Sequence, residues 1–278
     1  MAKFEDCAQE LISVIMGVKY RREETDTLRR AMDSVLCQTH TALEFIICEK
    51  NSTEAAKRLL KNYADKDSRV RLIDGSAAQN FSAQLNMCLK AARGEWIARM
   101  DDDDYSFPQR LEMQLNFLKS HEQFGFVGCN VGLVQDGSEI GVQRFPQEPQ
   151  VEDFLFSMPF IHPALMFRRI VLDDVQGYSE LPRCNRCEDY DMLLRLYGRG
   201  IRGANIQTVY FSYSLPPLGI TNRSFRDRVN EMKTRYCCFR QLGLLPKALP
   251  YVVKPVILWF MPKRLLARLK QKRNVDKE

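Results

Sequence analysis

The sequence predicts an α/β protein with a mostly parallel, doubly wound sheet, antiparallel additions and amphipathic helices at its C-terminus. Short β-rich apolar runs alternate with amphipathic helical stretches over residues 11–120. Such alternation favours parallel strands whose crossovers cover both faces of the sheet. Farther along, two apolar runs flank Asp136-Gly137, the turn signal of an antiparallel hairpin. The chain has 278 residues, 45% of them hydrophobic, so it can bury a full core and is not disordered overall.

The parallel half is predicted from periodicity and from helix-end signals. Apolar residues recur at the i, i+3, i+4, i+7 spacing over residues 28–36, where Thr25 or Asp26 can cap the first helix. Ser52 is expected to cap the second helix, and Gly94 to close the third. The expected strands are 11–18, 43–48, 70–73 and 95–98, with a fourth helix starting at Pro108.

The second half has a different pattern. The expected elements are a hairpin of 126–134 and 140–145, a short helix at 151–157, a strand at 161–167, a helix at 188–197 and a last strand at 204–213. We place the boundary near Pro216-Pro217, which gives an α/β domain over residues 1–217 and a basic, amphipathic helical tail over 218–278. Prolines at 246, 250, 255 and 262 are expected to cut this tail into short pieces.

Four consecutive carboxylates, Asp101 to Asp104, follow the buried strand at 95–98. Open α/β sheets place their ligands at the carboxyl ends of strands. Unpaired adjacent charges in a concave site would cost on the order of several kcal/mol, so a cation should join them. Closely spaced oxygen ligands suit Mg²⁺ or Mn²⁺. A solvated acidic turn is the alternative.

Cysteine usage and the apolar runs bear on the compartment. The nine cysteines are scattered mostly through apolar segments, which favours reduced, buried thiols in a cytosolic protein. Cys184-x-x-Cys187 has no second pair and the chain has three histidines, so no structural zinc site is expected. We expect no secretory signal and no membrane-spanning segment.

The basic charge is concentrated in the tail. From residue 247 onward the chain carries nine Lys and Arg against two acidic residues, whereas residues 1–246 carry a net charge of about −1. Apolar residues, including Trp259, are mixed with these basic ones. The pattern favours in-plane binding to an anionic membrane surface and no nucleic-acid partner, with the protein held at the inner face of the cell membrane. A packing arm or an oligomer contact is the alternative.

Six segments together resemble glycosyltransferase family 2, in that family's order, over about residues 11–213. They are Ser13–Val18, Ser34–Thr39, Phe45–Thr53, Gly94–Asp104, His162-Pro163 and Glu188–Asp191. The resemblance implies the GT-A fold and inverting transfer of a sugar from a nucleotide diphosphate donor. The tail resembles the amphipathic ends of bacterial members that build surface polysaccharides.

The resemblance also implies the donor-binding residues. Glu49 matches the family's acid that contacts the donor base, and Val18 and Lys19 lie at the same base-binding edge. Asp101 matches the first acid of the family's Asp-x-Asp, near the ribose, with Asp102 beside it. A carboxylate that accepts a hydrogen bond from uracil N3–H is physically reasonable at Glu49.

The second acid of the Asp-x-Asp is Asp103, which by resemblance binds a Mn²⁺ or Mg²⁺ ion that bridges the diphosphate. Asp104 is the acid that usually follows, and its role is open. His162 could be a further metal ligand or a hydrogen-bond donor to the diphosphate. A histidine before proline is also a common structural turn residue.

By resemblance Asp189 is the catalytic base, which takes the acceptor hydroxyl's proton. Its neighbours are rivals, because Glu188 and Asp191 share one helix face while Asp189 points about 100° away from Glu188. We expect only one of these faces to line the cleft. The remaining acids would then pair with Arg186 or Arg195.

We therefore expect a metal-dependent, inverting glycosyltransferase. It would transfer a sugar from a nucleotide diphosphate sugar, expected to be a UDP-sugar, onto a glycan or lipid-linked acceptor. Lys50 stands where a second Asp is common and Lys19-Tyr20 where Tyr-Asn is usual, so the base-binding edge is altered. One alternative is a sugar-1-phosphate nucleotidyltransferase, although Met16–Tyr20 lacks the Gly-rich loop such an enzyme would carry. The other is a catalytically silent membrane-bound scaffold of the same fold.

Overall fold

The computed structural model describes residues 10–216 and 223–261. Its strands are β1 (Ile12–Val18), β2 (Leu43–Glu49), β3 (Val70–Asp74), β4 (Trp96–Arg99), β5 (Tyr105–Ser106), β6 (Phe124–Gln135), β7 (Ser138–Gln143), β8 (Met166–Arg168) and β9 (Arg202–Leu215). Its α-helices are α1 (Asp26–Leu36), α2 (Glu54–Lys66), α3 (Phe81–Ala91), α4 (Arg110–Ser120), α5 (Asp153–Phe156), α6 (Arg169–Asp174), α7 (Glu188–Gly198), α8 (Phe225–Gln241) and α9 (Leu249–Trp259). Two 3₁₀ turns are η1 (His162–Ala164) and η2 (Pro182–Cys184).

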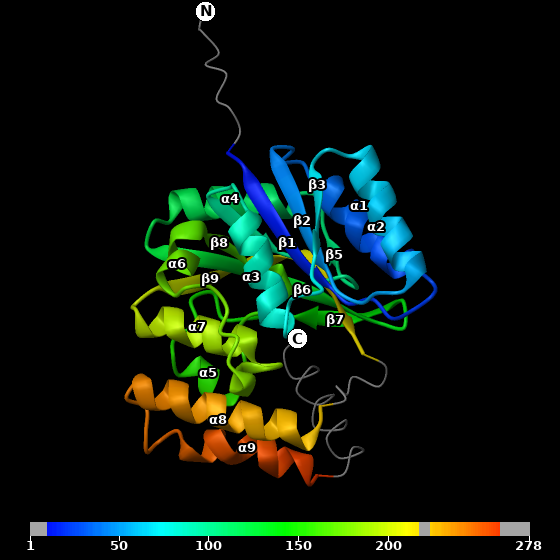
Figure 1. The fold of residues 1–278 in the computed structure, drawn as a ribbon. Coiled ribbons are helices and arrows are strands. Elements are labelled where there is room, and N and C mark those ends of the chain that lie inside the picture. Colours follow the sequence, from blue (N-terminus) through cyan, green and yellow to red (C-terminus); the bar gives the residue numbers. More distant parts are fainter. Residues whose placement is uncertain (1–9, 217–222, 262–278) are drawn as a thin grey trace, which may run out of the picture.

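The strands form one mixed sheet in the order β3-β2-β1-β4-β8-β6-β9-β5, with β7 paired to β6 (Figure 1). The β3-β2-β1-β4 half is parallel, as the alternating sequence predicts. The β6–β7 hairpin is antiparallel and closes at Asp136-Gly137, also as predicted. The α/β fold with antiparallel additions is therefore confirmed.

Helices cover both faces of the sheet and bury two apolar layers. Along β1, Val14 and Met16 join one layer while Ile15 joins the other, because successive side chains of a strand point to opposite faces. The first layer is covered by α1, α2 and α4, and the second by α3, α6, α7 and α8. This two-sided burial explains why β1 is apolar almost throughout.

The expected strand at 161–167 is wrong in its first part. His162 to Ala164 form the 3₁₀ turn η1, and strand β8 begins only at Met166. Pro163 accounts for the difference, because proline has no N–H for a sheet ladder and is favoured at the start of a helical turn. The pattern also missed β5 and α6, which are too short to show a period.

The cap prediction for the second helix is wrong by one residue. Thr53 is the N-cap of α2, and its side chain accepts a hydrogen bond from Ala56 N–H at 3.3 Å. Ser52 Oγ instead accepts from Tyr20 N–H at 2.9 Å, which ties the loop after β1 to the loop after β2. These two loops carry the predicted base-binding residues Lys19 and Glu49 or lie directly beside them.

At the C-terminal end, α8 and α9 pack against each other and lie below α7 in Figure 1. Helix α9 runs unbroken through Pro250 and Pro255, so the expected interruption there is wrong. Pro250 lies in the first turn, where its missing N–H costs little, and Pro255 is buried.

The predicted domain boundary at 217 and the expected effect of Pro262 lie outside the described residues. Among the described helices, none combines the length and the apolar character needed to cross a bilayer.

Candidate active site

The carboxyl ends of β1, β2 and β3 come together at one edge of the sheet. Register places Val18 beside Glu49, and Glu49 beside Asp74. Strand β4 lies on the other side of β1 and ends just before the acidic run, so that run follows the same edge. Parallel pairing thus gathers acids from three loops.

Much of the predicted donor-binding edge is held by internal hydrogen bonds. Glu49 Oε1 accepts from Ser52 N–H at 2.6 Å. The carbonyl of Val18 accepts from Lys50 N–H at 2.9 Å and from Gln84 Nε2 at 3.2 Å. The side chain of Val18 is buried and that of Lys19 is exposed, so Val18 can offer a ligand only its backbone.

The acidic turn is anchored at both ends. Arg99 at the end of β4 is fully buried and ion-paired with Asp101. Asp104 is buried and accepts from Ser214 N–H at 2.7 Å, while Ser214 Oγ donates to the carbonyl of Asp103. Asp101 and Asp104 are thus fixed, which leaves the half-buried Asp102 and Asp103 at the middle of the turn.

The middle of the turn is unfavourable for negative charge. Burial raises the pKa of Asp102 to about 7, and repulsion from Asp103 and Asp101 adds to this. Burial, followed by repulsion from Asp101, raises the pKa of Asp103 to about 6, against the opposing effect of Arg22. Both shifts are those expected where carboxylates are crowded without a neutralising cation.

The acidic turn fits a divalent cation by its donor chemistry. All its candidate ligands are carboxylate oxygens, which are the donors that Mg²⁺ and Mn²⁺ prefer. Within residues 10–216 and 223–261, no three His, Cys, Asp or Glu side chains are gathered around a common point. An ion that takes most of its ligands from phosphates and water needs no such group.

A cavity of about 270 Å³ joins the acidic turn to helix α7. Asp101 lines it on one side, and Glu188 and Asp189 line it from the first turn of α7 on the other. The remaining lining residues are Phe81, Arg99, Met158, Phe160, Ile161, His162, Pro163 and Tyr213. Of the sequence-predicted site residues, the cavity brings together Asp101, His162 and Asp189; Val18, Lys19, Glu49, Asp102 and Asp103 are not in its lining.

The expectation that only one face of α7 could line the cleft is wrong. Glu188 and Asp189 both line the cavity. They are the first two residues of α7, so the cavity meets the end of the helix and not one of its sides. Burial, then repulsion from Asp189, raises the pKa of Glu188 to about 7, and burial also raises the pKa of Asp189. Asp191 is instead buried in ion pairs with Arg183 at 3.1 Å and Arg195 at 2.7 Å.

His162 lies in the cavity wall with one nitrogen already engaged. Its Nε2 is 2.8 Å from Tyr178 Oη, and the two rings pack edge to face. Burial, reinforced by the positive charge of Arg99, holds the pKa of His162 well below its usual range. The histidine is therefore neutral, and Nδ1 is its other possible ligand atom.

Besides apolar lining residues, sequence reasoning missed two polar residues of the cavity, Arg99 and Tyr213. Arg99 is a charged residue at the end of an otherwise apolar buried strand, and that placement was a usable signal. Its guanidinium carbon lies 5.3 Å from the centre of the Phe81 ring, and its Nε has no hydrogen-bond partner in the described part of the chain. Tyr213 gave no signal, because it sits in a strand rich in aromatics.

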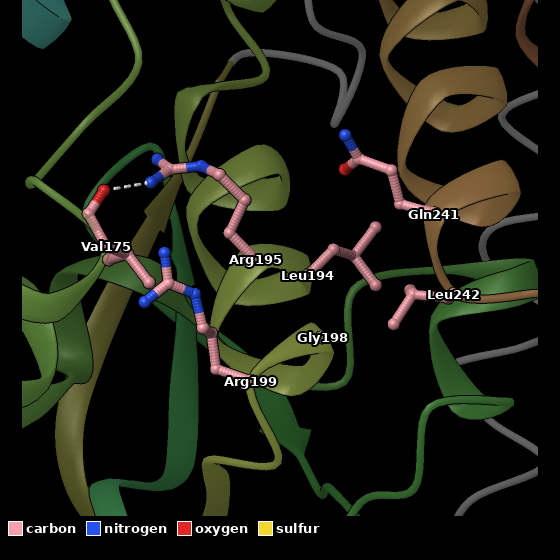
Figure 2. A pocket seen from close by; sticks show the side chains of 7 residues that line it. All are labelled: Val175, Leu194, Arg195, Gly198, Arg199, Gln241 and Leu242. Carbon is pink, nitrogen blue, oxygen red and sulfur yellow. Dashed lines mark hydrogen bonds between the residues drawn. The ribbon is translucent and has the colours of Figure 1, made fainter.

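A second cavity, of about 290 Å³, lies between the end of α7 and the end of α8 (Figure 2). Its arginines are used internally: Arg195 binds Asp191 and the carbonyls of Val175 and Gly177, and Arg199 pairs with Asp174 at 2.8 Å. Because both arginines are already held in internal ion pairs, the cavity joining the acidic turn to α7 is the better candidate active site.

Solved structures with the same fold exist. The TarS 1–349 structure from S. aureus in complex with UDP-GlcNAc aligns with a TM-score of 0.67 at 16% identity, covering 87% of this chain and 72% of that one. The mannosyltransferase PcManGT from Pyrobaculum calidifontis, in complex with GDP-Man and Mn²⁺, aligns with a TM-score of 0.61 at 16% identity, covering 98% and 82%. This likeness places the chain in the GT-A fold class.

Sequence comparison narrows this class. A family model described as Glycosyl transferase family 2 matches residues 13–175. The chain is 33% identical over 268 residues to EpsE of Bacillus subtilis (strain 168), covering 96% of this chain and 95% of that protein. It is 32% identical over 214 residues to the O-antigen biosynthesis glycosyltransferase WbnJ of Escherichia coli, covering 74% and 80%. It is 25% identical over 224 residues to WfaP of Escherichia coli, a UDP-Glc:alpha-D-GlcNAc-diphosphoundecaprenol beta-1,3-glucosyltransferase, covering 80% and 84%. The chain belongs to glycosyltransferase family 2.

Proposed function

We propose that this glycosyltransferase transfers a sugar from a nucleotide diphosphate sugar, with a UDP-sugar as the first candidate, onto a lipid-linked glycan acceptor. The transfer inverts the configuration at the anomeric carbon. The observation that carries the proposal is that one cavity is lined by Asp101 on one side and by Asp189 on the other. The donor lies along the acidic turn, and the acceptor hydroxyl approaches from α7.

Asp189 is the proposed base. It removes the proton of the acceptor hydroxyl as that oxygen attacks the anomeric carbon, and the bond to the diphosphate oxygen breaks on the opposite side. One displacement of this kind inverts the anomeric centre and needs no covalent intermediate. The buried position of Asp189 and its raised pKa favour proton acceptance over an exposed carboxylate.

A divalent ion, Mn²⁺ or Mg²⁺, held by Asp103 would neutralise charge on the departing diphosphate as a Lewis acid. Glu49, Val18 and Lys19 are proposed to bind the base, and Asp101 and Asp102 the ribose side of the donor. His162 is proposed to reach the diphosphate or the ion through Nδ1. The nucleotide sugars in the TarS and PcManGT complexes, and the Mn²⁺ in the latter, support a nucleotide-sugar donor and a divalent ion by likeness of fold.

The lipid-linked acceptor is supported by the relative WfaP and by the surface of α9. Ala248, Val252 and Pro255 form a buried stripe along this helix. A second apolar stripe, Leu249, Val253, Ile257 and Phe260, faces outward, and its last residue is 75% exposed. An apolar stripe turned away from the core suits the membrane interface, so we propose peripheral attachment there, at the cytoplasmic face.

The test is a screen of nucleotide sugars for release of the free nucleotide by the full-length protein with Mn²⁺. We expect one UDP-sugar to be hydrolysed slowly without acceptor and to be consumed faster when a lipid-linked glycan is added. Absence of metal-dependent turnover with every donor, while the protein remains folded, would refute the proposed function.

A further inference from the structure

Three arginines of the α8 region converge on one glutamate. Glu231 Oε2 lies 2.9 Å from Arg223 Nη1 and 3.4 Å from Arg228 Nη1, and Glu231 Oε1 lies 3.2 Å from Arg235 Nη2. All four side chains are at least partly buried. Three guanidinium groups sharing one carboxylate leave a local charge of about +2.

The three arginines are not equally committed. Arg235 is also bound to the carbonyl of Leu155 at 3.0 Å and lies over the Tyr190 ring at 4.7 Å, so it is structural. Arg223 and Arg228 share the single oxygen Oε2, and the Nε of Arg228 is buried with no hydrogen-bond partner among the described residues. A buried donor of this kind is unfavourable until an acceptor reaches it.

The cluster borders the catalytic end of α7. Arg223 is close enough to Asp189 and Glu188 to lower the pKa of each, against the larger effect of burial. Contacts between η2 and α8, including a 2.8 Å hydrogen bond from Thr234 Oγ1 to the carbonyl of Arg183, fix this arrangement. The positive cluster therefore lies on the side of the proposed base.

Exposed aromatic side chains continue from the cluster. Phe225, two residues after Arg223, packs against Trp259 and Phe260 with ring-centre distances of 6.0 and 6.3 Å. Each of these three rings is more than 40% exposed. A cationic cluster beside an exposed apolar surface matches a ligand with an anionic head and a hydrocarbon tail.

We propose that Arg223 and Arg228 bind the diphosphate of a lipid-diphosphate-linked acceptor, with the hydrocarbon chain lying along Phe225, Trp259 and Phe260. This inference rests on the proposed function and specifies its acceptor. A diphosphate diester carries two negative charges, opposite in sign to the three guanidinium groups of the cluster. Arginine's planar fork suits phosphate oxygens, and the buried Arg228 Nε supplies an additional donor.

The acceptor's diphosphate fits better here than the donor's. In an inverting displacement, the attacking hydroxyl and the leaving diphosphate lie on opposite sides of the anomeric carbon. The cluster lies beside Asp189, on the attacking side, whereas the acidic turn lies across the cavity.

The test uses the full chain and farnesyl diphosphate as the probe, with the donor site saturated by UDP and Mg²⁺, in titration calorimetry. We expect the wild type to bind farnesyl diphosphate under these conditions and to bind farnesol more weakly. Arg228→Gln should weaken farnesyl diphosphate binding about tenfold, and Arg228→Lys should weaken it less, because lysine keeps the charge but loses the fork. Arg240→Gln removes an equal charge at the exposed far end of α8 and should have no effect.

Three results would overturn the inference. Loss of farnesyl diphosphate binding on adding UDP would assign the cluster to the donor. Equal affinity in Arg228→Gln and Arg240→Gln would show that the cluster is not the site. If Arg228→Gln weakened binding to phosphatidylglycerol vesicles as much as it weakened binding to farnesyl diphosphate, the cluster would be a general site for lipid headgroups. None of these measurements needs turnover, so failure of donor hydrolysis would count against the proposed function alone.

Discussion

The backbone N–H of Ser214 donates a hydrogen bond to Asp104 Oδ1 at 2.7 Å, which joins the acidic turn to the last strand of the sheet. Asp104 Oδ2 is buried without a hydrogen-bond partner in the described part of the chain. Burial, together with repulsion from Asp103 and Asp101, raises the pKa of Asp104 well above its usual range. Through Oδ1, Asp104 therefore helps to hold the acidic turn against β9.

Replacing Asp104 by alanine should destabilise the protein by about 1–3 kcal/mol, because Ser214 N–H loses its acceptor in a partly buried position. Asp104→Asn keeps an acceptor oxygen and should cost less. Urea denaturation of both variants measures the difference, with Asp65→Ala on the exposed face of α2 as the control. Equal losses of stability in the alanine and asparagine variants would contradict a role for Asp104 in holding the acidic turn through its hydrogen bond to Ser214.

The second prediction concerns the base. Asp189→Asn should leave donor affinity within about twofold and reduce transfer by about 10²–10⁴-fold, because the amide cannot accept the proton. Calorimetry with UDP and a transfer assay separate the two quantities. Glu188→Gln is the matched control in the same turn of α7. If the glutamine variant loses transfer and Asp189→Asn keeps it, the base is Glu188.

Local periodicity was enough to predict the parallel half of the sheet and the place of the acidic run. The first strands and helices are each long enough to show a period, and parallel pairing then brings Glu49 and Asp101 to one edge. The helix with Asp189 was also predicted, and Asp101 and Asp189 line the same cavity.

What the sequence could not give depends on tertiary neighbours. The partner of Asp191 was expected to be Arg186 or Arg195. Arg195, four residues farther along the helix, is one partner, and the second partner is Arg183, which lies in the 3₁₀ turn η2. Likewise, Arg223 and Asp189 are neighbours only because α8 packs on α7. No spacing rule connects residues that meet through a loop.

The third prediction tests the metal. Asp103→Asn should abolish Mn²⁺-dependent release of nucleotide, because the amide removes the anionic ligand, and chelation with EDTA should do the same to the wild type. Electron paramagnetic resonance of Mn²⁺ in the presence of UDP provides a readout that needs no turnover. Asp74→Asn, an exposed acid at the same sheet edge, is the control. Unchanged Mn²⁺ binding in Asp103→Asn would remove that residue from the metal site.

The fourth prediction tests the outward stripe of α9. Ile257→Ser with Phe260→Ser should lower the partition coefficient onto phosphatidylglycerol vesicles, measured by co-sedimentation, by at least about 100-fold, because each buried apolar side chain contributes about 1.5–3 kcal/mol to interfacial binding. Ile140→Ser is the control, since Ile140 is 50% exposed on β7, away from the helices. A similar effect of both changes would mean that the stripe has no special part in membrane binding.

The last prediction concerns stability and pH. Glu44 is buried on β2 and accepts hydrogen bonds from Ser13 Oγ at 2.7 Å, Arg93 N–H at 2.6 Å and Arg71 Nη1 at 2.6 Å. Burial alone would raise its pKa, but these hydrogen bonds together outweigh burial and lower the pKa below 4.5. A lowered folded-state pKa means that the ionised form stabilises the protein above the unfolded-state pKa. That stabilisation is lost as the pH falls through the folded-state value.

Glu44→Gln should therefore cost about 1–3 kcal/mol at pH 7, since the amide cannot serve both arginines. Urea denaturation from pH 7 to pH 3 should show the gap between wild type and variant narrowing below about pH 4.5. Glu54→Gln, which removes only an exposed pair with Lys57, should show little change at either pH. A gap that stays constant on acidification would mean that Glu44 contributes through packing, because the volume of the side chain does not titrate whereas its charge does.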